Sequence, residues 1–498
     1  MNKKSLPPLE RLGTGSPALD EILGGGPPAG SVIVVMGEPG SGKTVFTLQM
    51  MFHLARQGRK CLYFTTLSEP ALKVIRYMQQ FAFFDAGLME DRIHFADLGS
   101  IIRKEGPGEA MARVKDRVEN EEPAFVAIDS FKAIHTINGD ANRSRTLVYD
   151  LAVNMASWQA TTFLVGEYLR SDIGELPEFA IADGILRLGG QPQELTTVRE
   201  LEILKLRGTD YITGRHFFEM SNTGLTFYPR VRGPSRNGDA WVSAERVTTG
   251  VGGLDELLAG GLPRASTTFL EGGTGTGKTL IGLHFLREGV RKGEPGILFT
   301  LEETPEQLRG IAHNFGWNFK ALERSRGLTL HHTSPVELST DSFLNTVRQR
   351  TEELKARRIV LDSITTLGLG VPSSRRFREL VYAMTKHFHA AGVTSVMTIE
   401  TPKLVGLTQL TGERISAAAD NLILLSYVEL DGKLERAISV VKARGINHQR
   451  HLHRFVIGKR GVAIGSGLAN LRGVLTGIPM PATPSPLSPL ERRKKRKP

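Results

Sequence analysis

Two glycine-rich segments of this sequence have residue types suited to binding a polyphosphate. Residues 37–44 and 272–279 both fit the pattern G-x-x-x-x-G-K-[ST]. In such a loop, backbone N–H groups wrap the phosphates, so side chains must be absent where the chain approaches them, and the following helix adds partial positive charge. We expect two nucleotide sites, whose loops contain Gly37, Gly40, Ser41, Gly42, Lys43 and Thr44, and Gly272, Thr274, Gly275, Thr276, Gly277, Lys278 and Thr279.

The lysine and threonine that end each loop have separate expected roles. Lys43 and Lys278 reach the β- and γ-phosphates, whereas the hydroxyls of Thr44 and Thr279 ligate Mg²⁺. Because each loop lies between an apolar strand-like run and a helix-like stretch, nucleotide binding is favoured over a purely structural glycine turn.

An aspartate in each half can complete a magnesium site. Asp129 and Asp362 each end an apolar run that predicts a buried strand, where a carboxylate can hold the Mg²⁺ shell. The alternative is an aspartate that caps the next segment. It is disfavoured because a phosphate loop is present in both halves. The sequence therefore predicts two Mg-nucleotide sites.

Hydrolysis needs a carboxylate that orients and deprotonates the attacking water. Glu302 and Glu303 follow a predicted strand in the second half and offer a pair. In the first half, Ser68 and Glu69 align with them, and a serine hydroxyl cannot act as a base near neutral pH. Loss of a general base typically costs about 10²–10⁴-fold. Glu69 is then the candidate at the first site, with solvated loop glutamates as the alternative.

A pair of cations recurs late in each half. Lys205 and Arg207, and Lys442 and Arg444, are spaced i, i+2, which places both side chains on one side of a strand. Such a pair can reach the γ-phosphate of a neighbouring subunit as an arginine finger. A solvated strand edge is the ordinary alternative, and recurrence in both halves favours the functional interpretation.

These motifs belong to an internal repeat with a period of about 235 residues. A repeat of this length indicates two whole tandem domains, because solenoid repeats run about 20–50 residues. Turn-forming residues cluster at 230–239, and prolines recur after residue 475. We expect an N-terminal domain at 1–235, a C-terminal domain at 236–475 and a disordered, proline-rich and basic tail at 476–498. The matching segments are 14–26 and 249–261, 37–44 and 272–279, 127–130 and 360–363, and 205–208 and 442–445.

Short apolar runs alternate with longer amphipathic stretches in both halves. Buried strands that alternate with helices predict an α/β fold, with a mainly parallel sheet covered by helices on both faces. A helix is expected over 44–51. The strands expected are 31–36, 61–65, 125–128 and 162–165 in the first half, and 296–300, 359–361 and 394–399 in the second.

Composition excludes several classes of protein. Hydrophobic residues make up 40% and charged residues 23%, as in ordinary globular proteins, and no apolar run approaches the length of a membrane span. The N-terminus has no apolar signal segment, and Cys61 is the single cysteine, so we expect a cytoplasmic protein without a membrane partner. The net charge is +11, but the last eight residues alone carry +5. A strongly basic DNA-binding body is therefore not indicated.

Taken together, the motifs resemble those of the KaiC family, the double-domain RecA-like ATPases and autokinases of the cyanobacterial circadian clock and their bacterial homologues. The resemblance covers about residues 11–470. It rests on the Leu-Asp-Glu entry segments, both phosphate loops, the double glutamate, Lys-x-Arg-Gly in both halves, and Leu-Leu-Ser-Tyr-Val-Glu at 424–429. It implies two tandem RecA-like P-loop NTPase domains that form an ATP-dependent double-ring homo-hexamer. Nucleotides would be held between subunits, with an N-terminal ATPase ring and a C-terminal ring with serine/threonine autokinase and autophosphatase activity.

The resemblance also assigns roles to individual residues. Glu302 and Glu303 resemble the catalytic pair of the C-terminal ring, and Lys442 and Arg444 resemble the groups that act across the interface. The family's phosphoacceptors are an adjacent serine and threonine. Ser416 is retained in this sequence.

Three departures limit what the resemblance implies. Ala417 replaces the neighbouring threonine, so a two-step cycle at adjacent residues cannot operate, although Thr411 matches a nearby threonine linked to phosphate transfer. An inert Ser416 is the alternative. Ser68 puts hydrolysis in the N-terminal ring in question. The tail differs from the family's partner-binding peptide, so a KaiA-like partner is not expected, and a KaiB-like partner is the candidate that remains.

Two other functions compete with an ATP-hydrolysing switch. One is a RecA/RadA-type DNA-dependent ATPase, against which stand the absent zinc-finger cysteines, the modest charge of the body and the two fused domains. The other is a nucleotide-gated scaffold in which the N-terminal ring binds ATP without hydrolysing it.

Overall fold

The computed structural model describes most of the 498-residue chain. Contacts within the chain divide it into two compact units, Met1–Arg230 and Val231–Pro498, and each unit contains one copy of the repeat. The domain boundary predicted at 235 lies outside the described residues and stays a prediction. The described residues are 9–67, 69–134, 146, 148–150, 154–155, 158–193, 196–230, 243–334, 340–371, 374–401, 415–430, 432–468, 471–472 and 480–481.

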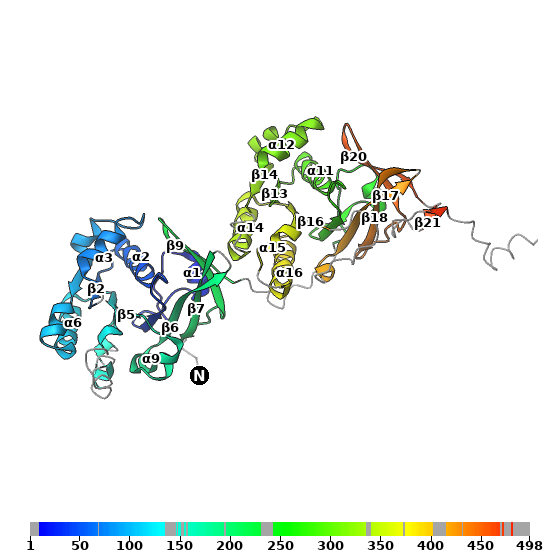
Figure 1. Cartoon of the computed structure of the whole chain (residues 1–498). Helices are drawn as coiled ribbons and strands as arrows, with labels where there is room; N and C mark the ends of the chain where they lie inside the picture. Colours follow the sequence, from blue (N-terminus) through cyan, green and yellow to red (C-terminus); the bar gives the residue numbers. More distant parts are fainter. Residues whose placement is uncertain are drawn as a thin grey trace, which may run out of the picture. The chain divides into compact units, whose positions relative to one another are not determined.

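The first unit is built on one nine-stranded sheet in the order β3-β2-β4-β5-β1-β6-β7-β8-β9 (Figure 1). The strands from β3 to β6 are parallel, and β6 to β9 form an antiparallel meander. Its strands are β1 (Val32–Met36), β2 (Cys61–Thr65), β3 (Ile93–Asp97), β4 (Phe125–Asp129), β5 (Thr161–Gly166), β6 (Gly184–Gln193), β7 (Thr196–Leu206), β8 (Arg215–Ser221) and β9 (Gly224–Tyr228). Its helices are α1 (Pro17–Ile22), α2 (Lys43–Arg56), α3 (Ala71–Met78), α4 (Leu88–Asp91), α5 (Gly99–Lys104), α6 (Pro107–Glu121) and α9 (Pro177–Ile181), with a 3₁₀ turn η1 (Arg170–Gly174).

The second unit repeats this sheet in the order β14-β13-β15-β16-β12-β17-β18-β19-β20. Its sheet strands are β12 (Thr267–Gly272), β13 (Gly296–Thr300), β14 (Leu328–His332), β15 (Arg358–Asp362), β16 (Thr394–Glu400), β17 (Asn421–Leu430), β18 (Lys433–Ala443), β19 (His453–Gly458) and β20 (Gly461–Gly467). Its helices are α10 (Leu254–Leu257), α11 (Lys278–Arg291), α12 (Pro305–Asn314), α13 (Phe319–Arg324), α14 (Thr340–Leu354), α15 (Ile364–Leu369) and α16 (Ser374–Ala390), with η3 (Ile415–Ala417). The short strands β10 (Arg246–Val247) and β11 (Leu262–Pro263) pair with each other.

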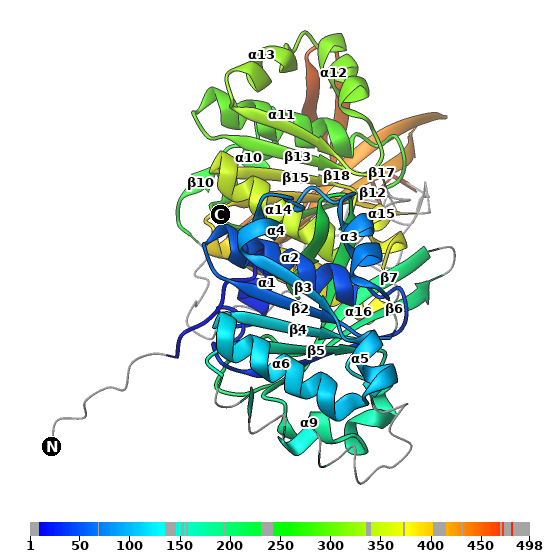
Figure 2. The same cartoon turned by 90° about the vertical axis from the view of Figure 1, so that its left-hand side faces the viewer.

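Both faces of the parallel part of each sheet are buried, as the apolar runs predict. In the first unit, Ile33 and Val35 of β1 belong to the core that includes the buried face of α2, whereas Val34 and Met36 belong to the core under α6. Successive side chains of a strand point to opposite faces, so one continuous apolar run supplies both cores. Figure 2 shows α2 and α6 on opposite sides of β2 in the same sheet. The predicted α/β class with mainly parallel sheets is confirmed.

Parallel strands bring the functional segments of each unit to one edge of the sheet. The carboxyl end of β1 leads into the first glycine loop. β5, which pairs with β1, and β4, which pairs with β5, end at the same edge of the sheet. Gly42, the residue before α2, has φ of 95°, a left-handed conformation that glycine adopts without the Cβ penalty. The sharp change from strand to helix therefore depends on this glycine.

Near the C-terminus, the structure describes two short strands. Leu471–Arg472 (β21) pairs antiparallel with Met480–Pro481 (β22). Disorder of the whole tail stays a prediction, because the other residues after 472 lie outside the described part. Within the described residues, no helix is both long enough and apolar enough to cross a membrane.

Candidate functional site

The first glycine loop curls around the ammonium group of its own lysine. Lys43 Nζ donates to the carbonyl oxygens of Gly37 at 3.0 Å and Glu38 at 2.9 Å. A Cβ on Gly37 would lie 2.1 Å from the carbonyl oxygen of Leu188, so only glycine fits where the loop leaves β1. Burial lowers the pKa of Lys43, and the nearby carboxylate of Glu167 is the largest of the charges that oppose this shift.

A hydroxyl and a buried carboxylate meet beside this loop. Thr44 Oγ1 donates to Asp129 Oδ2 at 2.8 Å, and the Tyr63 hydroxyl donates to the same oxygen at 2.6 Å. Burial raises the pKa of Asp129, while the Tyr63 and Thr44 hydrogen bonds and the Lys43 charge lower it. Hard oxygen donors of this kind are what Mg²⁺ prefers, so Thr44 and Asp129 fit the predicted metal site.

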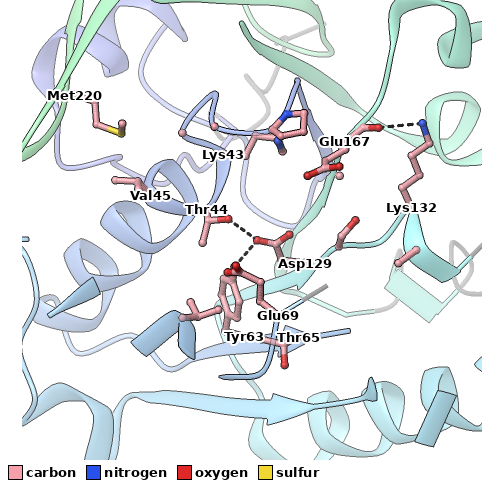
Figure 3. A pocket seen from close by; sticks show the side chains of 17 residues that line it. Lys43, Thr44, Val45, Tyr63, Thr65, Glu69, Asp129, Lys132, Glu167 and Met220 are labelled. Carbon is pink, nitrogen blue, oxygen red and sulfur yellow. Dashed lines mark hydrogen bonds between the residues drawn. The ribbon is translucent and has the colours of Figure 1, made fainter. Parts of the chain in front are cut away.

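These groups open into a cavity of about 770 Å³ (Figure 3), a size within the range of small-molecule and cofactor sites. Figure 3 shows Lys43, Asp129, Glu69 and Glu167 around it, with Met220 at a more distant part of its lining. The cavity therefore combines a cation and carboxylates with apolar contacts. Its lining residues are Pro39, Gly40, Gly42, Lys43, Thr44, Val45, Tyr63, Thr65, Glu69, Val74, Asp129, Ser130, Lys132, Ala133, Gly166, Glu167 and Met220.

The second loop has the same internal geometry. Lys278 Nζ donates to the carbonyl oxygens of Gly272 at 3.0 Å and Gly273 at 2.9 Å. Thr279 Oγ1 donates to Asp362 Oδ2 at 2.7 Å. The other oxygen of Asp362 accepts from the Thr398 hydroxyl, and burial raises the pKa of this aspartate. Thr279 and Asp362 thus fit a second magnesium site.

The paired glutamates of the second unit lie in different environments. Glu302 Oε1 accepts hydrogen bonds from Ser363 Oγ at 2.8 Å and from the Thr366 hydroxyl. Burial raises the pKa of Glu303, and the negative charges of Asp362 and Glu302 raise it further. A raised carboxyl pKa lies closer to neutral pH, where a general base works best. Glu302 is thus held by two hydroxyl donors, whereas Glu303 has a raised pKa.

The first unit does not repeat this arrangement. Ser68 lies outside the described residues. Glu69 lines the cavity, but its Oε1 forms an ion pair with Lys73 Nζ at 3.0 Å, and both side chains are more than two-fifths exposed. The connection from β2 to α3 is one residue longer than that from β13 to α12. Glu69 and Glu303 each lie two residues before the helix that follows, α3 and α12 respectively, so these two glutamates correspond in the repeat.

The four cationic residues predicted to act as arginine fingers lie at the edge of each sheet where the parallel strands begin, opposite the edge with the glycine loop. They are Lys205, Arg207, Lys442 and Arg444. Ala443 pairs with Asn421, which pairs with Thr268 near the amino end of β12, so Lys442 and Arg444 are remote from the loop that follows Gly272. Lys442 Nζ donates to the carbonyl oxygen of Ala419 at 2.6 Å, and Arg444 lies 3.5 Å from Asp420.

Lys205 and Arg207 have the same placement in the first unit, where Leu206 pairs with Gly184 and Gly184 with Ile33. Arg207 lies 3.4 Å from Asp183. Burial, followed by the adjacent arginine charge, lowers the pKa of Lys205, and the same two causes lower that of Lys442.

The predicted phosphoacceptors are only partly within the described chain. The backbone at Ser416 forms the 3₁₀ turn η3, and Thr411 lies outside the described residues. The hydrogen bond from Lys442 to the Ala419 carbonyl links this segment to β18.

Sequence analysis missed four residues that the fold brings to the two sites. Tyr63 and Thr366 act through long-range hydrogen bonds that no motif records. Glu167 directly follows β5, and Glu400 is the last residue of β16, the strands that pair with each loop strand. Their recurrence in the repeat is a signal that could have identified them.

Comparison with known proteins supports one family. The model of the KaiC ATPase family matches residues 12–232 and 247–469. The circadian clock oscillator protein KaiC of Picosynechococcus sp. is 28% identical over 491 residues, which cover 96% of this chain and 94% of the relative. The circadian clock protein KaiC3 of Synechocystis sp. is 29% identical over 487 residues, with 95% of each chain covered. The KaiC of Synechococcus elongatus is 27% identical over 497 residues, which cover 97% of this chain and 94% of the relative.

These matches confirm two tandem RecA-like domains and do not favour the DNA-dependent ATPase. They imply nucleotide binding and ATPase activity for both repeats. Because the family model covers most of both units, this chain belongs to the KaiC family of tandem-domain ATPases.

Proposed function

We propose that this chain is a magnesium-dependent ATPase that assembles as a homo-hexameric double ring and works as a signalling or timing switch. Its C-terminal domain would also act as a serine/threonine autokinase, with Ser416 or Thr411 as acceptor. The observation that supports this most directly is the recurrence of one constellation in both units: a loop lysine, a loop threonine and a strand-ending aspartate.

Each residue of this constellation has a distinct task in phosphoryl transfer. A bound Mg²⁺ would supply positive charge that offsets the negative charge on the transferred phosphoryl group. Thr279 and Asp362 would hold that ion in the second unit, while the Lys278 ammonium leaves its loop carbonyls for the phosphates. Glu302, held by two hydroxyls, would orient the attacking nucleophile, and Glu303 would take its proton.

The position of the finger residues supports assembly into rings. Thr268 and Gly272 are four positions apart along β12, which is about 13 Å at the rise of a strand and longer than a lysine or arginine side chain. Lys442 and Arg444 therefore serve the nucleotide of a neighbouring subunit, not their own. A contact between unlike surfaces of identical subunits gives a ring when the rotation from one subunit to the next closes, and a helical filament when it does not. We propose the closed ring, in which Lys205 and Arg207 would act likewise in the first unit.

The relatives are named as circadian clock oscillator proteins, which supports a timing role for this chain. A KaiB-like protein is the partner that we propose for that role. Ala417 limits the analogy, because only one acceptor of the adjacent pair is present.

Two experiments test the proposal. Purified protein is incubated with Mg²⁺ and γ-labelled ATP, and released phosphate and protein-bound label are followed together, with peptide mapping. Release with label on Ser416 or Thr411 supports an autokinase ATPase, whereas release alone leaves an ATPase switch and removes the kinase activity. Absence of both refutes the proposal.

The second experiment tests action between subunits. A Lys278→Ala chain and a Lys442→Ala/Arg444→Ala chain should each lose second-site turnover. Mixing them should restore part of it, because a Lys278→Ala subunit can supply its cations to an intact loop. No recovery in mixed hexamers would contradict the trans arrangement.

A further inference from the structure

In each unit, the strand that pairs with the glycine-loop strand and the next strand beyond it each carry an acidic residue at the carboxyl end. In the first unit, Asp129 ends β4 and Glu167 directly follows β5, which pairs with β1 through Met36 and Gly166. In the second unit, Asp362 ends β15 and Glu400 ends β16, where it pairs with Gly272. Because the carboxyl ends of parallel strands meet at one edge, each loop has two carboxylates beside it. The aspartate is assigned to the metal, and the glutamate has no role in the motif.

The backbone around Glu167 is held on both sides. The next residue, Tyr168, is buried and packs edge-to-face against Phe179 at 5.1 Å. A Cβ on Gly166 would lie 2.4 Å from the Tyr168 ring, so glycine lets the strand end pass beneath it. Lys132 Nζ donates to the Glu167 carbonyl oxygen at 2.9 Å. Glu167 therefore leaves a fixed backbone into the cavity, on the side of Lys43 (Figure 3).

The two units differ in the hydrogen-bond partner of this glutamate side chain. In the second unit, the hydroxyl of Thr274 in the glycine loop donates to Glu400 Oε1 and ties that carboxylate to the loop. The repeat places Pro39 at the position of Thr274, and proline has no side-chain donor. Within the described residues, the Glu167 side chain has no hydrogen bond or ion pair. It is exposed to the cavity and free to contact a ligand.

The first unit has fewer carboxylates than the second at the positions predicted to serve hydrolysis. The second unit has Glu302 and Glu303, whereas the first has Ser68 and a Glu69 that is engaged with Lys73. We propose that Glu167 is the catalytic carboxylate of the first site, where it orients and deprotonates the water that attacks ATP. This inference rests on the proposed hydrolysis at that site.

The proposed hydrolysis involves water, ATP, Glu167 and Lys43. One water O–H proton passes to a Glu167 carboxylate oxygen as the water oxygen bonds to the γ-phosphorus. The bond from that phosphorus to the β,γ-bridging oxygen breaks, and ADP leaves with the electron pair. Glu167 then returns the proton to solvent or to the released phosphate. Lys43 balances the charge on the transferred group.

The test isolates the first site in the full chain. A Lys278→Ala background removes nucleotide binding from the second site, and ATP turnover is measured at saturating ATP together with binding of a fluorescent ATP analogue. Glu167→Gln, which keeps shape and removes the base, should lower turnover at least about 100-fold with analogue binding retained. Glu69→Gln should lower it less than threefold. Glu175→Gln, the same change at an exposed residue outside the cavity lining, is the matched control and should leave turnover unchanged.

The possible outcomes distinguish a wrong role for Glu167 from an absence of hydrolysis at the first site. If the Lys278→Ala chain turns over ATP and Glu167→Gln retains more than half of that rate, Glu167 is not the base and the inference is overturned. A fall equal to a loss of analogue binding would also overturn it, since that result indicates a binding role. If the Lys278→Ala chain binds the analogue but releases no phosphate, first-site hydrolysis itself fails and the inference fails with it.

Discussion

Thr366 offers a direct test of how the second site holds its catalytic glutamate. Its hydroxyl and that of Ser363 donate to the same oxygen of Glu302. Thr366→Val keeps the shape of the side chain and removes one donor. A hydrogen bond to a charged group contributes about 1.5–3 kcal/mol, and each 1.36 kcal/mol of activation free energy is tenfold in rate. If the bond acts fully in the transition state, second-site turnover should fall by about 10–100-fold.

The assay needs the second site alone, so it uses a Lys43→Ala background and measures phosphate release at saturating ATP. KM should change little, because the lost contact orients Glu302 and does not bind the nucleotide. Thr346→Val is a matched control, since that hydroxyl donates to the Ser342 carbonyl within α14. Turnover within twofold of the parent, or a loss that follows nucleotide affinity, would refute a positioning role for Thr366.

Three further outcomes follow from the same geometry. Ser68→Glu alone should raise first-site turnover less than Ser68→Glu/Ala133→Thr, because Ala133 stands where Thr366 holds Glu302; equal rates in a Lys278→Ala chain would contradict this. Burial raises the pKa of Asp362, so the folded second unit binds a proton more readily than the unfolded chain and its stability falls as pH rises through that shifted pKa. Asp362→Asn should abolish turnover yet raise the melting temperature of the nucleotide-free protein at neutral pH, and an unchanged or lower melting temperature would oppose the assignment. Burial lowers the pKa of His284 to about 4, so stability should be lost as pH falls from about 6.5 towards 4; urea unfolding of His284→Gln should lack that part of the pH dependence.

The glycine loops and the strand-ending aspartates could be predicted because local sequence dictates them. A loop that wraps phosphate needs glycine at fixed positions, and a buried parallel strand needs an uninterrupted apolar run. Gly37 illustrates this constraint, since any Cβ there would meet the Leu188 carbonyl. Such requirements act within a few residues and leave a pattern that one sequence displays.

The contacts that distinguish the two sites could not be predicted in the same way. Thr366 lies 64 residues from Glu302, and Tyr63 lies 66 residues from Asp129. A threonine or tyrosine in such a segment is ordinary core composition until the sheet order is known. The position of Lys442 at the opposite edge from its own loop likewise depends on which strand pairs with β12, a property of topology and not of residue type.

The differences between the two units form a consistent set, and Pro39 completes it. Because Ser68 replaces the glutamate, a hydroxyl at position 133 would have no carboxylate to bind. Ala133 therefore loses no hydrogen bond to a catalytic residue. If Glu167 must then reach the nucleotide, a donor at position 39 would bind it to the loop, as Thr274 binds Glu400. Pro39→Thr should therefore slow first-site turnover in a Lys278→Ala chain, by about 10-fold for a bond of about 1.5 kcal/mol to a carboxylate. Pro39→Ala, which adds no donor, is the matched control for the lost proline. Equal rates for the two variants would show that Glu167 need not be free, and the difference between the two loops would then have no bearing on catalysis.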